Sequence, residues 1–273
     1  MLSKIRALFF ICALTCMSAC TNLLYYPDRF LWSHPTTQKI NVDPFMHPSL
    51  DGTMLSFWHL YSAIEKMASN KTLILFFHGN AQNLTAHSAY FYWLLKNHPV
   101  DVISFDYRGY GLSEGMPYPQ GMFSDGLAAL DYAYKVYREN KYKKIMVYAQ
   151  SLGGYLALRS LKDFKERDAL NGLILESTFK DPQKVAIQKA SILGYLISGE
   201  GVHDLELTFL KMPLLVMHDR RDPVVPFSFG AALFKEIPAV KKSLIETNQG
   251  THVATMFIDS EKNRALFLQF LNE

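Results

Sequence analysis

The chain has 273 residues, of which 49% are hydrophobic and 19% charged, and its formal net charge is +3 at pH 7. This length and composition are typical of one globular domain and exclude a disordered or low-complexity protein. The charge is small and scattered, without a long run of one sign, so it does not indicate a nucleic-acid partner.

The N-terminal segment differs from the rest of the chain. It starts with the basic residues Lys4 and Arg6, continues with an apolar run over 7–14 and ends in small residues. That order is typical of an export signal peptide, and the apolar run is shorter than the roughly 20 residues that span a bilayer. We therefore expect a signal peptide over residues 1–19, rather than an uncleaved signal anchor.

The residues M-S-A-C at 17–20 resemble a bacterial lipobox, although Met17 stands where lipoboxes usually have leucine. The resemblance implies cleavage before Cys20 and attachment of lipid to that cysteine. Thr21 replaces the aspartate that marks inner-membrane retention in such lipoproteins, which favours the outer membrane. We expect a protein of the bacterial cell envelope that is anchored in the membrane by its N-terminal lipid and faces the periplasm or the cell surface.

All three cysteines lie in this leader. Disulfides, a cysteine nucleophile and thiolate metal sites are thereby excluded from residues 21–273. Residues 20–50 are expected to form an N-terminal arm, whose aromatic stretch we expect to pack onto the domain rather than to dip into a membrane. The large apolar residues of this stretch are Tyr25, Tyr26, Phe30, Leu31 and Trp32.

From residue 50 onward, short β-rich runs alternate with longer segments of helical spacing. Several of the runs are apolar without alternation, as expected for strands that are buried on both faces of a parallel sheet. The pattern predicts an α/β fold, with a mostly parallel sheet and helices on both faces. The predicted strands are 55–60, 72–78, 100–106, 144–149, 172–177, 213–219 and 243–247, and the clearest helices are 122–140, the segment after Ser151, and 260–271.

Residues suited to catalysis follow several of these strands. Ser151 comes after the strand at 144–149, Asp219 and Asp222 lie at and after the end of the strand at 213–219, and His252 follows the last strand. Parallel strands place their carboxyl ends at one edge of the sheet, where ligands of such folds bind. We therefore expect a serine, an acid and a histidine to meet at this edge.

This chain order resembles the α/β-hydrolase superfamily, and most closely its lipase-, esterase- and acyl-thioesterase-like members. The resemblance runs from about residue 50 to the C-terminus and implies an α/β-hydrolase domain over 51–273. It is carried by HGN at 78–80, DYRGYG at 106–111, AQSLGG at 149–154, HDRRDPVVP at 218–226 and GTH at 250–252.

The resemblance implies a catalytic triad. Ser151 is the expected nucleophile, and His252 is the base that removes its proton. A carboxylate must hold the other ring nitrogen of the histidine, and Asp222 fits the family frame H-G-x-x-D-x-x-V-P. Asp219 takes the place of the glycine in that frame and is the nearest competitor. Weaker candidates for the acid are Asp204 and Glu176.

The tetrahedral oxyanion needs two backbone N–H donors. Leu152, directly after the nucleophile, is expected to supply one, and the loop after the strand at 72–78 the other, from Asn80 or alternatively from Ala81. His78 is expected to orient this loop. A sharp turn at the nucleophile demands small neighbours, which Gly153 and Gly154 provide, while Ala149 stands where G-x-S-x-G has its first glycine.

The segment 181–211 is expected to form one helix and a short flap, a small cover that leaves an open apolar mouth. The whole pattern predicts a serine hydrolase that cleaves a small-molecule acyl ester or thioester through an acyl-enzyme. No cofactor is expected, and the histidines show no metal-ligand spacing. Two alternatives remain: a serine peptidase or amidase on the same fold, and a non-catalytic binding lipoprotein.

Overall fold

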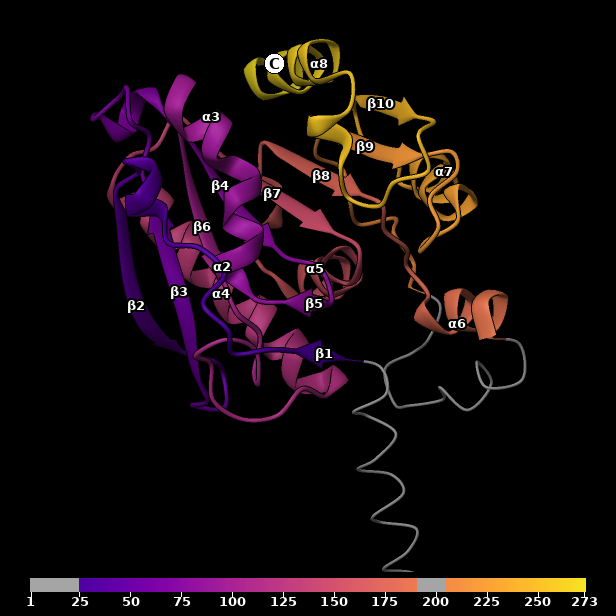
Figure 1. The fold of residues 1–273 in the computed structure, drawn as a ribbon, viewed down its shortest axis with the longest axis horizontal. Coiled ribbons are helices and arrows are strands. Elements are labelled where there is room, and N and C mark those ends of the chain that lie inside the picture. Colours follow the sequence, from indigo (N-terminus) through magenta and orange to yellow (C-terminus); the bar gives the residue numbers. More distant parts are fainter. Residues whose placement is uncertain (1–24, 191–204) are drawn as a thin grey trace, which may run out of the picture.

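The computed structural model describes residues 25–190 and 205–273. Its centre is an eight-stranded sheet with the strand order β10-β9-β8-β7-β4-β6-β3-β2, which Figure 1 shows side by side. All neighbouring strands run parallel except for β3, which is antiparallel to both β2 and β6. The predicted α/β fold with a mostly parallel sheet is therefore confirmed.

The strands of this sheet are β2 (Val42–Pro48), β3 (Met54–Leu60), β4 (Thr72–Phe77), β6 (Val100–Phe105), β7 (Lys144–Gln150), β8 (Gly172–Glu176), β9 (Leu214–Asp219) and β10 (Lys242–Thr247). The α-helices are α2 (Leu84–His87), α3 (Tyr92–Asn97), α4 (Pro119–Glu139), α5 (Leu152–Asp163), α6 (Pro182–Ala190), α7 (Phe227–Glu236) and α8 (Ser260–Asn272). Short 3₁₀ turns are η1 (Pro35–Gln38), η2 (Ala68–Asn70), η3 (Ser88–Phe91), η4 (Arg167–Ala169) and η6 (Thr255–Phe257).

The central strand β4 is apolar without alternation, and its contacts on the two faces of the sheet explain this pattern. Leu73, Leu75 and Phe77 join one hydrophobic cluster, together with side chains of α4, α5 and α7. Ile74 and Phe76 point the other way and join a second cluster, with side chains of α3 and α8. Successive side chains of a strand face opposite sides of a sheet, so a strand that is covered by helices on both sides must be apolar throughout.

Strand β2 was not predicted from the sequence, and it lies within the segment 20–50 that was expected to form an arm. It is an edge strand with Pro44 and Pro48, and most of its side chains are exposed. Proline cannot donate a hydrogen bond and is tolerated at a sheet edge, and such a strand carries little apolar signal. The sheet therefore begins before the expected boundary at residue 51.

The N-terminal arm is fixed at its start by a two-residue parallel pairing between β1 (Tyr26–Pro27) and β5 (Ala81–Gln82). Tyr25 is buried, as expected of a stretch packed on the domain, but the expectation is wrong for the other large apolar side chains. Those exposed side chains are Tyr26, Phe30, Leu31 and Trp32.

Three sequence-based expectations fall outside the described residues: the signal peptide over 1–19, the lipid site at Cys20, and the part of the cover segment at 191–204. The described part of the cover segment begins with α6. Over residues 25–190 and 205–273, the structure contains no helix with the length and hydropathy needed to cross a bilayer.

Candidate active site

Ser151 occupies the sharp turn between β7 and α5. Its backbone has φ of 50° and ψ of −121°, a region that residues other than glycine rarely adopt. The turn is held by the Ser151 N–H, which donates to the Glu176 carbonyl at 2.9 Å, and by the Thr178 hydroxyl, which donates to the Ser151 carbonyl. The strained conformation places Ser151 at the carboxyl edge of the sheet.

The turn leaves no room for a side chain at the two glycines that follow. A Cβ at Gly153 would lie 2.4 Å from the carbonyl oxygens of Phe77 and His78, and one at Gly154 would lie 2.0 Å from Thr178 Oγ1. Both positions therefore require glycine, as the sequence predicted. Ala149, at the end of β7, is fully buried, so the turn accepts a methyl group on the strand side.

The structure brings Ser151, Asp222 and His252 together. His252 Nε2 lies 3.0 Å from Ser151 Oγ, and His252 Nδ1 lies 2.8 Å from Asp222 Oδ2. A carboxylate can only accept, so Nδ1 carries the hydrogen and donates it to Asp222. That tautomer leaves Nε2 as an acceptor for the serine hydroxyl, the arrangement that a general base requires.

Asp222 is held as a carboxylate. Its other oxygen, Oδ1, accepts the N–H groups of Val224 and Val225 at 2.8 and 2.9 Å. Burial alone would raise the pKa of Asp222, but the hydrogen bond and charge of His252 and these two N–H groups outweigh burial and keep the pKa below its usual range. His218 Nε2 donates to the Val225 carbonyl at 2.8 Å, and burial lowers the pKa of His218.

The competing acid, Asp219, has different partners. Its carboxylate accepts the backbone N–H groups of Arg221, Gln249 and Gly250 and the hydroxyl of Thr247. Burial works against these donors, but together they lower the pKa of Asp219 to about 2. Asp219 therefore fixes the loop that carries His252 and is not its hydrogen-bond partner.

Glu176, another candidate for the acid, also has a structural role. Its buried carboxylate accepts the hydroxyls of Tyr90 and Tyr148, the Gln150 amide and the Thr255 N–H at 2.6 to 2.9 Å. It thereby ties the residue before Ser151 to the loop after His252. Asp204 lies outside the described residues. Among the acid candidates that the structure describes, Asp222 alone contacts His252.

The predicted oxyanion donors lie on two elements that border Ser151. Leu152 is the first residue of α5, where the unpaired N–H groups of a helix start favour negative charge. The loop after β4 is close as well, because a Cβ at Gly79 would lie 3.7 Å from Ser151 Cβ. Asn80 Oδ1 accepts the N–H of Tyr26 at 3.1 Å and the hydroxyl of Tyr110 at 2.8 Å. The Asn80 side chain thus fixes the loop whose backbone N–H is the predicted donor.

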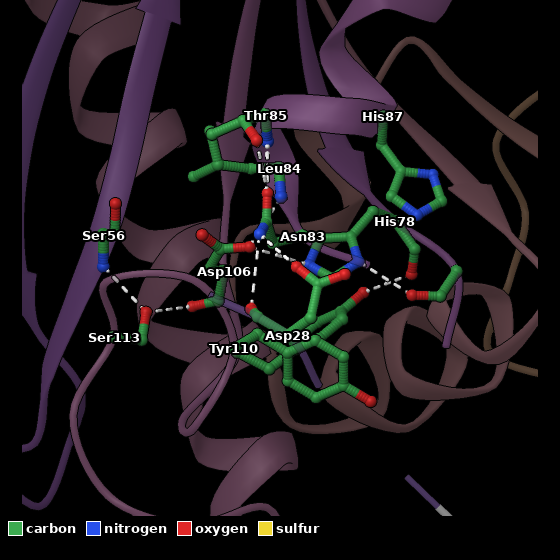
Figure 2. Close-up of polar contacts among 12 residues, drawn as sticks. Asp28, Ser56, His78, Asn83, Leu84, Thr85, His87, Asp106, Tyr110 and Ser113 are labelled. Carbon is green, nitrogen blue, oxygen red and sulfur yellow. Dashed lines mark hydrogen bonds and ion pairs between the residues drawn. The ribbon is translucent and has the colours of Figure 1, made fainter. Parts of the chain in front are cut away.

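Two histidines hold the loop after β4 through hydrogen bonds to its backbone, and Figure 2 shows them beside Asp106. His78 Nδ1 donates to the Gly79 carbonyl at 2.7 Å, and its Nε2 lies 3.3 Å from Asp106 Oδ1. His87 Nε2 donates to the Ala81 carbonyl at 2.8 Å. Burial and the neighbouring His78 lower the pKa of His87 to about 3, so it remains neutral.

The role of His87 and the anchoring of Asn80 to Tyr26 could not be predicted from the sequence, since local spacing does not reveal contacts between distant segments. Asn83, which caps α2 by accepting the Thr85 N–H at 3.0 Å, could have been found from its type and its position before a helix. Across 25–190 and 205–273, no group of three or more His, Cys, Asp or Glu side chains is arranged to hold a metal ion.

Residues 68–207 match the protein family described as serine aminopeptidase, S33. The chain is 28% identical over 241 residues to the Salmonella typhi protein YfhR, a match that covers 85% of this chain and 80% of that one. It is 30% identical over 246 residues to mouse lysophosphatidylserine lipase ABHD12, covering 78% of this chain and 61% of that protein.

Among solved structures, the Pyrococcus furiosus esterase PF2001 superposes with a TM-score of 0.72 at 21% identity, covering 91% of this chain and 97% of that one. This likeness shows the shared fold. The family match spans the loop at His78 and the turn at Ser151. The chain therefore belongs to the serine aminopeptidase, S33, family of α/β hydrolases and is a hydrolase.

Proposed function

We propose that this hydrolase cleaves carboxylic esters or thioesters through a covalent acyl-enzyme, with Ser151 as nucleophile, His252 as base and Asp222 as the group that orients the base. The observation that carries the proposal is the continuous chain of contacts from Asp222 through His252 to Ser151, at 2.8 and 3.0 Å. The strained backbone of Ser151 and its place at a helix start support the same assignment.

Each step follows from these positions. His252 Nε2 takes the Ser151 proton as Oγ attacks the carbonyl carbon, and the oxyanion forms beside the N–H groups of Leu152 and Asn80. The tetrahedral intermediate then collapses, its bond to the alkoxide or thiolate breaks, and His252 gives its proton to that group, which departs as the alcohol or thiol and leaves an acyl group on Ser151. Water, deprotonated by His252, attacks this ester, and the bond between the acyl carbon and Ser151 Oγ breaks while His252 returns the proton to Oγ, which releases the carboxylic acid and the free serine.

Ester cleavage is proposed ahead of amide cleavage. The name of the mouse relative describes a lipase, whereas the family description names an aminopeptidase. A peptidase that holds a free amine needs an available carboxylate near the site. In the cover segment, Asp181 accepts the Lys184 N–H at 3.0 Å and pairs with the Lys184 ammonium at 3.3 Å. Its carboxylate is therefore engaged by the first turn of α6 rather than available to a substrate amine.

A substrate panel tests this choice. Purified protein is given p-nitrophenyl acyl esters, acyl thioesters and aminoacyl p-nitroanilides, with the Ser151→Ala variant as the matched control. We expect turnover of the esters or thioesters that disappears in the variant. Turnover confined to the aminoacyl amides would favour the peptidase alternative.

We also propose that Cys20 carries lipid and anchors the protein in the bacterial envelope, on the side of the periplasm or the cell surface. The support is the order of basic, apolar and small residues that ends at Cys20. Labelling of growing cells with an alkyne fatty acid should mark the wild-type protein in the membrane fraction and leave the Cys20→Ala variant unmarked. An unmarked wild-type protein would refute the anchor.

A further inference from the structure

The N-terminal arm is held on the domain by hydrogen bonds of its backbone and of the Asp28 side chain. Asn83 Nδ2 donates to Asp28 Oδ1 at 2.7 Å and to the Phe30 carbonyl at 2.8 Å, as Figure 2 shows for Asp28. The Gly111 N–H donates to the Asp28 carbonyl at 2.9 Å, and the Trp32 N–H donates to a threonine hydroxyl of α2. The arm is therefore a fixed part of the surface.

Several large apolar side chains of this fixed arm are nevertheless exposed. Trp32 Nε1 donates to the Asp28 carboxylate at 3.0 Å, so the polar atom of the indole is satisfied, and the Phe30 ring packs edge-on against it at 5.2 Å. Leu112 follows Gly111, whose N–H donates to the Asp28 carbonyl of the arm. We define the arm face as Tyr26, Phe30, Leu31, Trp32 and Leu112, which are 61%, 65%, 59%, 48% and 74% exposed.

An apolar group of this kind, held outward by a rigid backbone, indicates a contact surface. Its composition fits the interfacial layer of a bilayer, where tryptophan and tyrosine place a polar edge among the headgroups and the rest of the ring among the acyl chains. The exposed Arg29 in the same stretch can attract an anionic headgroup.

The position of the arm face points to the same partner. Tyr26 comes six residues after Cys20, and six extended residues reach about 20 Å. A lipid on Cys20 would therefore keep the arm face close to the membrane surface. We propose that the arm face inserts into the interfacial layer of the lipid bilayer, an inference that rests on the proposed lipid anchor.

Insertion would also orient the candidate active site. The pairing of β1 with β5 places Tyr26 beside Ala81, in the loop that lies against Ser151. With the arm face in the headgroup layer, this loop faces the membrane. The proposed hydrolase would then take acyl substrates that reside in the bilayer, as well as soluble ones.

The test uses the full-length protein, produced in bacteria that process lipoproteins, in phospholipid vesicles whose acyl chains carry bromine, which quenches tryptophan fluorescence on contact. The chain has three tryptophans, and Trp58 is buried while Trp93 is half-buried beside Phe267 and Arg264. We expect quenching in the wild-type protein and loss of most of it in Trp32→Phe. The double variant F30S/L31S should stay with the vesicles and show weaker quenching.

Vesicle flotation and hydrolysis of a soluble p-nitrophenyl ester are measured on the same samples. They separate the three proposals, which are insertion of the arm face, the lipid anchor at Cys20 and ester hydrolysis at Ser151. Floating protein without bromine quenching would overturn insertion of the arm face and leave the anchor standing. Protection of Trp32 from aqueous acrylamide without bromine quenching would mean that protein covers the arm face, and would overturn the inference as well. Protein that does not float would refute the anchor, and ester hydrolysis reports the catalytic proposal independently.

Discussion

His252 Nε2 lies 3.0 Å from Ser151 Oγ, although 101 positions separate the two residues in the chain. The contact is produced by the sheet. Ser151 follows β7, Asp222 follows β9 and His252 follows β10, and these strands run parallel within one half of the sheet. Their carboxyl ends share one edge, so three short loops suffice to join the side chains.

The assignment of Asp222 predicts a large loss of turnover in Asp222→Asn. The asparagine amide would donate toward His252 Nδ1 and move the ring hydrogen to Nε2, where it blocks acceptance of the serine proton. We expect kcat for a p-nitrophenyl ester to fall by a factor of about 10⁴ with little change in KM. A loss below tenfold would show that another acid orients His252.

Asp219→Asn provides the matched comparison, since Asp219 lies three residues away and supports the same loop. The variant should keep most of its turnover but lose about 2 kcal/mol of unfolding free energy at pH 7, because several donors lose their charged acceptor. The pKa of Asp219 lies at about 2, below its ordinary value of 3.8. Its contribution is therefore full above about pH 4 and is lost as the pH falls toward 2. Urea unfolding across this range should show the wild-type and variant curves converging.

Gly153→Ala should destabilise the turn at Ser151. The new methyl group would meet two backbone oxygens at 2.4 Å, which no side-chain rotation can relieve. We expect a loss of about 3 kcal/mol in unfolding free energy, together with loss of turnover. Gly79→Ala is the control, because its methyl group would meet atoms only at 3.6 Å or beyond and should cost less than about 1 kcal/mol. Equal stability of the two variants would contradict the packing argument.

Glu176→Gln tests the buried carboxylate behind the site. The substituted amide turns one acceptor into a donor that faces tyrosine hydroxyls, so we expect a loss of about 2 kcal/mol in thermal or urea unfolding. Tyr148→Phe removes a single donor and should cost about 1 kcal/mol. A glutamine variant as stable as the wild type would mean that the carboxylate does not hold the end of β7 and the loop after His252 together.

The residues at the strand ends could be predicted from the sequence because each one follows an apolar run of strand length, and parallel pairing turns that local signal into proximity. Asp219 and Asp222 could not be separated in the same way. Both belong to one turn, in which the Asp222 N–H donates to the Asp219 carbonyl, and only the path of the chain decides which carboxylate meets His252.

Long-range contacts account for the other differences. The N-terminal arm reaches Asn80 across 54 positions of sequence, and nothing in the local pattern of Tyr26 or Asn80 reveals this hydrogen bond. The aromatic stretch of the arm is predicted from the sequence to pack onto the domain. Here the arm is held by hydrogen bonds of its backbone and of polar side chains such as Asp28 and Ser33, and most of the rings are exposed.

The most direct test of the proposed mechanism is whether Ser151 is the reactive nucleophile. The protein is treated with a fluorophosphonate probe, digested and mapped by mass spectrometry, and Ser151→Ala is assayed with a p-nitrophenyl acyl ester alongside. We predict one adduct on Ser151, and a variant that keeps its thermal unfolding profile but does not hydrolyse the ester. An unlabelled Ser151, or undiminished hydrolysis by the alanine variant, would contradict the proposed nucleophile and with it the mechanism.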